Sequence, residues 1–215
     1  MGSQQRFYIA AQGPLPTTVL HFWQAVWENN VHLVVMLTDA TRGLDKAFPY
    51  WPQQDDTSVE CGDFTVARKM STPSRAYVTS RLLLTERGSR KSRVVWHLQF
   101  TDWADHGCPE DAAGFVQFVD ELATLRQTAA SEMAVAHGGS RNTPVLVHCS
   151  AGVGRTGVTV MCDVLLHCLD HNLEVDVPKL LHHLRQQRML MVQTMTQYKF
   201  IYQVLVHYLK RSRLI

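Results

Sequence analysis

One short segment limits the folds open to this chain more than any other feature. It reads Val147-His-Cys-Ser-Ala-Gly-Val-Gly-Arg-Thr-Gly157, and it follows the apolar run 144–148 and precedes a helical pattern. A strand that turns directly into a helix points several backbone N–H groups at one spot, where the helix N-terminus adds about half a positive charge. The segment therefore predicts a strand–loop–helix unit that cradles an anion of phosphate size.

The side chains of this loop suggest a reaction. Cys149 would lie at the foot of the cradle, where N–H donors stabilise a thiolate, the nucleophilic form of cysteine. Arg155 can form two parallel hydrogen bonds to phosphate oxygens. Two glycines permit the dihedrals that such a nest needs. The predicted phosphate-binding set is Ser150, Ala151, Gly152, Val153, Gly154 and Arg155.

Two neighbours are predicted to assist the sulfur atom. Thr156, at the helix start, could donate its hydroxyl proton to the sulfur and ease its departure as a leaving group. His148 would lie behind the thiol and orient it by hydrogen bonding. A cysteine buried only for packing is the alternative, but a cysteine, three glycines and an arginine in one loop argue against it.

Two other phosphate-binding motifs compete for the same loop. Gly152, Gly154 and Gly157 satisfy the G-x-G-x-x-G pattern of dinucleotide-binding folds. That fold needs further strands downstream, and only helical sequence follows. The Walker motif also fails, because no Lys-Ser/Thr pair follows the glycines.

Hydrophobic periodicity predicts an α/β (or α+β) chain with a mixed sheet covered by C-terminal helices. Breaks at Ser74 and Gly88-Ser89 predict antiparallel hairpins. The polar stretch 128–143 is expected to be an exposed loop. The expected strands are 32–37, 64–69, 76–85, 93–100 and 144–148, and the expected helices are 17–30, 112–128, 156–171, 177–188 and 194–211.

Composition excludes several classes of protein. The 215 residues carry 21 Lys and Arg against 19 Asp and Glu, and a net charge of +2 is not the footprint of a nucleic-acid-binding protein. No apolar run approaches the ~20 residues of a membrane span, and the first residues lack a signal-peptide core. Five scattered cysteines without a CxxC pair favour neither disulfides nor zinc, and they fit a reducing cytosol.

The segment 148–157 resembles the signature of classical protein tyrosine phosphatases. Other matches fall in the family's order, and the run 101–111 with the terminal 212–215 further resembles the non-receptor, FERM-domain-carrying Pez-like group. The similarity covers nearly the whole chain. The other matching motifs are Tyr8-Ile-Ala-Ala-Gln-Gly-Pro14, Phe22-Trp23, Val26-Trp27, Tyr50-Trp51-Pro52, Trp96-His97, Gln193 and Gln197.

The resemblance implies a highly twisted mixed sheet flanked by helices, with the cysteine loop between a central strand and a helix. It implies hydrolysis of phosphotyrosine in proteins through a phosphocysteine intermediate, without metal or other cofactor. Asp105 would be the general acid and then the general base. Gln193 would position the hydrolytic water, and Gln197 would support it.

The chain departs from the family pattern in three places. Ala104 replaces the proline before the acid, which should loosen that loop and weaken the chemistry. The glutamate that pairs with the loop arginine has no clear match near Thr41, where Asp39 or Asp45 could substitute. The family's Lys-Asn-Arg-Tyr segment, with its strand and helices, is missing before the Tyr-Ile stretch, which should leave a shallower pocket and some apolar surface uncovered.

These features predict a single phosphatase domain over 1–215 that lacks the N-terminal phosphotyrosine-recognition segment. It would belong to a larger FERM-containing, cytoskeleton-associated protein of the cytoplasm or cell junctions. Phosphotyrosine-containing proteins are the expected partners. The main alternative is a weakly active or inactive phosphotyrosine-binding scaffold, and a second is a phosphatase acting on phosphoserine or lipid.

Overall fold

The computed structural model describes residues 5–38, 48–103, 107–109, 111–137 and 142–212. The strands are β1 (Tyr8–Gln12), β2 (Leu33–Met36), β3 (Thr57–Cys61), β4 (Phe64–Pro73), β5 (Tyr77–Glu86), β6 (Ser92–Phe100) and β7 (Val145–Cys149). The helices are α1 (Val19–Glu28), α2 (Ala112–His137), α3 (Gly154–Asp170), α4 (Val177–Gln187) and α5 (Met195–Arg211).

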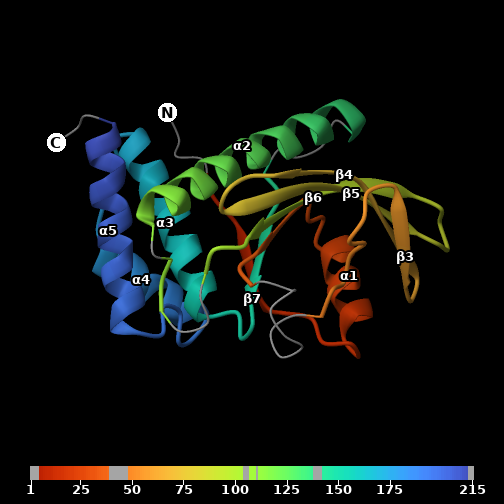
Figure 1. The fold of residues 1–215 in the computed structure, drawn as a ribbon, viewed down its shortest axis with the longest axis horizontal. Helices are drawn as coiled ribbons and strands as arrows, with labels where there is room; N and C mark the ends of the chain where they lie inside the picture. Colours follow the sequence, from red (N-terminus) through yellow and green to blue (C-terminus); the bar gives the residue numbers. More distant parts are fainter. Residues whose placement is uncertain (1–4, 39–47, 104–106, 110, 138–141, 213–215) are drawn as a thin grey trace.

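The strands form one mixed, twisted sheet in the order β1-β7-β2-β6-β5-β4-β3 (Figure 1). β1, β7, β2 and β6 run parallel to one another, whereas β6, β5, β4 and β3 pair antiparallel. The predicted mixed sheet and its hairpins are confirmed. β7 lies between β1 and β2, so the loop that follows it leaves the parallel half of the sheet.

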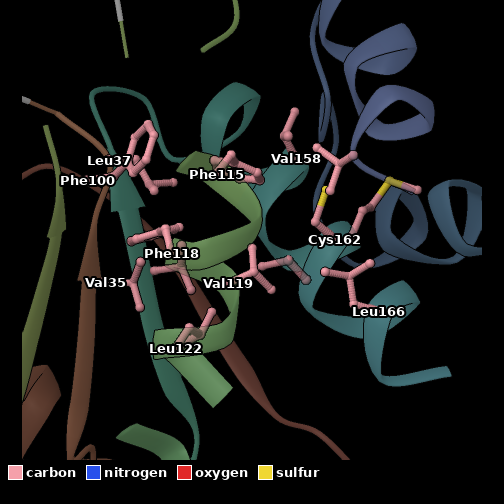
Figure 2. Close-up of a cluster of buried hydrophobic side chains, with 14 of the residues drawn as sticks. Val35, Leu37, Phe100, Phe115, Phe118, Val119, Leu122, Val158, Cys162 and Leu166 are labelled. Carbon is pink, nitrogen blue, oxygen red and sulfur yellow. The ribbon is translucent and has the colours of Figure 1, made fainter. Parts of the chain in front are cut away.

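Helices cover both faces of the parallel half. β2 and β7 are buried along their whole lengths, as expected for strands covered on both sides. In β2, Leu33 and Val35 face the core made with α2, α3 and α5, whereas Val34 faces the core made with α1. Figure 2 shows the first core, with Phe118 of α2 and Cys162 of α3 among its side chains.

The structure corrects the predicted loop over 128–143 for residues 128–137, whereas residues 138–141 lie outside the described part of the chain. α2 continues to His137, because Ala129 and Met133, four residues apart, keep one buried face on the helix. Glu132 lies on the same turn and accepts a hydrogen bond from Trp96 Nε1 at 3.0 Å. These contacts outweigh the small, polar composition from which a loop was predicted.

Two strands at the sheet edges were not predicted. β1 is only partly buried, and β3 has four exposed residues out of five, so neither shows a buried run or a clear alternation. The remaining predicted elements match to within a few residues.

Of the helices described, none is long and apolar enough to cross a membrane.

Candidate active site

The cysteine loop has the predicted strand–loop–helix form. β7 ends at Cys149, and α3 begins five residues later at Gly154. The N-cap residue Val153 offers no side-chain hydrogen bond to the first turn of α3. The amide groups at this helix start are therefore not capped by the N-cap side chain, which suits an anion-binding site.

The sulfur atom of Cys149 accepts two hydrogen bonds. The backbone N–H of Gly152 and the hydroxyl of Thr156 both lie 3.2 Å from Sγ. The cysteine is only 5% exposed and sits at the bottom of the loop. Because both donors face the sulfur, they stabilise negative charge on it. The hydrogen bond from Thr156 is the contact that the sequence predicted.

The other thiols have different surroundings. All five cysteines are free. Burial raises the pKa of Cys108 to about 11, and it raises the pKa of Cys162 further, so both thiols are protonated at neutral pH. Cys162 packs in the hydrophobic core, as expected for a cysteine that serves as a small apolar side chain.

Gly152 is required by the close approach of β1. Its φ of +73° lies in the left-handed region, and a Cβ atom there would meet the Ala11 carbonyl oxygen at 2.1 Å. The same two segments are joined by a hydrogen bond from Gly13 N–H to the Ser150 carbonyl at 3.0 Å. The loop that holds Cys149 is thus packed directly against the end of β1.

A basic residue that the sequence did not point to donates hydrogen bonds to carbonyl oxygens of the cysteine loop. Arg188, just after α4, donates from Nε to the Gly152 carbonyl at 3.0 Å and from Nη2 to the Ala151 carbonyl at 3.4 Å. By occupying these carbonyl oxygens, it favours a loop whose N–H groups face the opposite way. No spacing in the sequence marks this residue, because its partners lie 36 and 37 positions earlier.

Arg155 lies at the edge of the loop in the first turn of α3. Its Nη1 donates to the Leu37 carbonyl at 3.0 Å, and its guanidinium carbon lies 6.0 Å from the centre of the Trp103 ring. These contacts hold the cation between the end of β2 and the start of the loop predicted to carry the general acid. A guanidinium held this way has less freedom to lose when it binds an anion.

The two predicted glutamines reach the same loop. A Cβ atom on Gly154 would meet Gln193 Oε1 at 2.6 Å and Gln197 Nε2 at 3.0 Å, so both amides lie against this glycine. Gln197 Oε1 also accepts a hydrogen bond from the Gln193 N–H at 2.9 Å. The structure therefore brings both glutamines to the cysteine loop, with Gln197 holding Gln193.

His148 contacts the backbone of Cys149 rather than its sulfur. Its Nδ1 lies 3.4 Å from the Cys149 carbonyl oxygen, and its Nε2 lies 2.7 Å from the Tyr50 hydroxyl. The same hydroxyl lies 2.7 Å from His97 Nε2. The predicted hydrogen bond that orients the thiol is thus replaced by a contact with the main chain, within a buried cluster that also includes Tyr50 and His97.

This cluster predicts a pH-dependent stability. Burial lowers the pKa of His97 to about 3 and that of His148 to about 4. Both are neutral in the native state, whereas the unfolded chain binds protons below about pH 6.5. The free energy of unfolding should therefore fall as the pH drops from about 6.5 towards 4, by up to about 1.4 kcal/mol per pH unit for each histidine.

Urea unfolding between pH 4.5 and 7.5 measures the slope of the free energy of unfolding against pH. His97→Gln should reduce the slope relative to the parent chain, and the exposed His182→Gln should leave it unchanged. An equal slope in all three proteins would show that these buried histidines do not govern it.

The comparisons with known proteins agree with the geometry of the loop. The family model described as protein-tyrosine phosphatase matches residues 1–207. This chain belongs to the protein-tyrosine phosphatase family. The resemblance inferred from residues 148–157 is thereby confirmed.

Individual phosphatases are similar to this chain along almost its entire length. Human tyrosine-protein phosphatase non-receptor type 14 is 45% identical over 218 residues, covering 100% of this chain. Rat non-receptor type 21 is 45% identical over 97% of the chain, and mouse type 20 is 35% identical over 96%. The chain spans only 18% of the length of the first two and 46% of the third.

Some family positions predicted from the sequence lie outside the described residues. They are the general acid Asp105, the preceding Ala104, and the places suggested for the paired acid, Thr41, Asp39 and Asp45. Trp103, the last described residue before Asp105, is buried and donates from Nε1 to the Gly107 carbonyl at 3.0 Å.

Within the described part of the chain, no group of three or more His, Cys, Asp or Glu side chains could hold a metal ion.

Proposed function

We propose that this domain hydrolyses phosphotyrosine in proteins through a phosphocysteine intermediate. The observation that carries the proposal is the sulfur of Cys149, which accepts hydrogen bonds from Gly152 N–H and Thr156 Oγ1. A nucleophile at the base of an amide-lined loop, with a cation at its edge, suits attack on a phosphoryl group. The relatives of the family are named tyrosine-protein phosphatases, which supports phosphotyrosine as the substrate.

In the first step, Cys149 Sγ attacks phosphorus and a sulfur–phosphorus bond forms while the bond to the tyrosine oxygen breaks. Asp105 gives its proton to that oxygen, so tyrosine leaves as a neutral phenol. The amides of 150–155 and the guanidinium of Arg155 bind the three remaining phosphoryl oxygens. Arg188 keeps the loop in the orientation that this binding requires, through its bonds to Ala151 and Gly152.

In the second step, water attacks phosphorus and the sulfur–phosphorus bond breaks. Asp105, now a carboxylate, takes the proton of the water, and inorganic phosphate leaves. Thr156 stabilises the thiolate that departs, through the hydrogen bond at 3.2 Å. Gln193, held by Gln197, positions the water beside Gly154.

The proposal extends to the larger protein that contains this domain and to its location in the cell. Residues 1–215 are taken as one phosphatase domain of a larger, FERM-containing protein that is cytoplasmic and associated with the cytoskeleton or cell junctions. The similarity to non-receptor types 14 and 21, of which the chain spans 18%, supports a place within a larger non-receptor phosphatase. Proteins that carry phosphotyrosine are the proposed partners.

A rapid-quench, single-turnover measurement tests the proposed reaction. With enzyme in excess over a phosphotyrosine peptide, we expect release of tyrosine together with a phosphoryl group bound to Cys149. The matching phosphoserine peptide should react at least ~10²-fold more slowly. Saturable peptide binding without release of tyrosine would instead identify a phosphotyrosine-binding scaffold, and equal rates on both peptides would identify a broader phosphatase.

Gln193→Ala should separate the two steps. Because Gln193 is proposed to position the water only, formation of phosphocysteine should keep its rate while the second step slows by about 10-fold to 10²-fold. Steady-state assays should then show an initial burst, and phosphocysteine should accumulate. Gln203→Ala, an exposed position in α5, serves as the control. Equal slowing of both steps would exclude a role confined to water.

A further inference from the structure

The segment that joins α4 to α5 has an unusual backbone. We call residues 188–194 the α4–α5 turn (Figure 1). Two of its residues that are not glycine lie in the left-handed region, Leu190 with a φ of +64° and Val192 with a φ of +60°. Val192 is β-branched and buried, and such a side chain rarely adopts a positive φ. A conformation of this kind persists only where the surrounding contacts enforce it.

Arg185, in the last turn of α4, supplies one of these contacts. Its Nε donates to the Met191 carbonyl at 2.9 Å, and its Nη2 donates to the Val192 carbonyl at 2.7 Å. In an extended chain, successive carbonyl groups point to opposite sides. The curled backbone at Val192 lets both carbonyls face one guanidinium group. The two bonds therefore favour the left-handed conformation and oppose its relaxation to an extended one.

The same turn is also fixed to the cysteine loop and to α3. Val192 N–H donates to the Val153 carbonyl at 3.1 Å. A Cβ atom on Gly157 would lie 2.5 Å from the Val192 nitrogen, so the turn lies directly against the first turn of α3. The Val192 side chain is part of the hydrophobic core. The position of the α4–α5 turn is therefore set relative to the loop that holds Cys149.

The peptide group between Val192 and Gln193 is held at both ends. Its carbonyl accepts from Arg185, and its N–H donates to Gln197 Oε1 at 2.9 Å. Because a peptide group is planar, these two bonds fix the direction in which the chain enters Gln193. Gln193 Oε1 then lies where a Cβ atom on Gly154 would meet it at 2.6 Å. A rotation of this peptide group would move the amide side chain away from Gly154.

We propose that Arg185 is a positioning residue for the second step of the reaction. It holds the α4–α5 turn in the conformation from which Gln193 reaches the hydrolytic water. Its bonds to the turn end on main-chain carbonyls, so it acts through Gln193, whereas Arg188 bonds to the cysteine loop itself. The inference rests on the proposed function, because it uses the role of Gln193 in placing the water.

Arg185→Met, which removes the donors and keeps a long side chain, tests the proposal. In rapid-quench measurements with a phosphotyrosine peptide, formation of phosphocysteine should stay within about twofold of the parent chain, and its hydrolysis should slow by about tenfold. In the steady state kcat and KM should then fall together, whereas partial unfolding would lower kcat and leave KM unchanged. Lys179→Met, which removes an exposed cation from the same helix, is the control and should change neither step.

A double variant shows whether Arg185 acts through Gln193. Phosphocysteine in Arg185→Met/Gln193→Ala should be hydrolysed at a rate within about twofold of that in Gln193→Ala alone. Slowing by the product of the two single effects would overturn the proposal, as would an unchanged second step in Arg185→Met. Circular dichroism checks folding. Arg185→Lys keeps the charge but not the planar pair of donors, so its second step should also slow, and it replaces Arg185→Met if that variant does not fold.

Hydrogen exchange provides a measurement that does not depend on turnover. The amides of Val192 and Gln193 should exchange at least about tenfold faster in Arg185→Met than in the parent chain, and Lys179→Met should leave them unchanged. Equal protection in Arg185→Met and the parent chain would overturn the role of Arg185 even if the parent chain is an active phosphatase. A parent chain that forms no phosphocysteine would instead contradict the proposed function, and with it the assignment of Arg185 to the second step.

Discussion

Cys149→Ser is expected to reduce turnover of p-nitrophenyl phosphate by ~10³-fold or more. A serine hydroxyl is almost entirely protonated at neutral pH, so the hydrogen bonds from Gly152 and Thr156 no longer stabilise a ready nucleophile. The phosphate-binding amides and Arg155 remain, and the variant should still bind a phosphotyrosine peptide. Steady-state kinetics and calorimetry on the same preparation measure the two effects.

Cys61→Ser is the matched control, because this thiol is half-buried at the end of β3 and far along the sheet from β7. Its turnover should stay within about twofold of the parent chain. Mass spectrometry should detect phosphocysteine in the control but not in Cys149→Ser. Retained turnover in Cys149→Ser would contradict the proposed mechanism as a whole.

Gly152→Ala should damage both stability and activity. A methyl group at this φ of +73° would lie 2.1 Å from the Ala11 carbonyl oxygen, so either the loop or β1 must move. The left-handed conformation alone costs an alanine about 1–2 kcal/mol, and the collision adds to that. We expect unfolding to become easier by at least about 2 kcal/mol and turnover to fall by ~10²-fold or more, as the N–H donor to Cys149 is displaced.

Gly88→Ala provides the comparison for this substitution. No atom lies within 4 Å of the position that a Cβ atom on residue 88 would take. The free energy of unfolding of this variant should therefore differ from that of the parent chain by less than about 0.5 kcal/mol. Chemical denaturation gives the two free energies, and assays at a temperature where both variants are folded give the rates. A stable, fully active Gly152→Ala would show that the loop does not need this glycine.

Local sequence predicted the elements that are buried on both faces. β2 and β7 read as continuous apolar runs, and α3 follows β7 after a glycine-containing loop, so both the strands and the loop between them were recognisable. The edge strands β1 and β3 lack such a pattern, because one or both of their faces are exposed. The extension of α2 to His137 depends on packing against the sheet, which composition does not reveal.

The sequence by itself determined the reactive loop, since Cys149, the glycines and Arg155 lie within a few residues and hydrogen bonding there is local. Only the tertiary structure decided which contacts hold that loop, although the resemblance had already pointed to the two glutamines. Arg188 reaches it from beyond α4, Gln193 and Gln197 reach it from the start of α5, and β1 forces a glycine at position 152. These contacts join residues far apart in the chain, and they form only when the sheet and helices pack together.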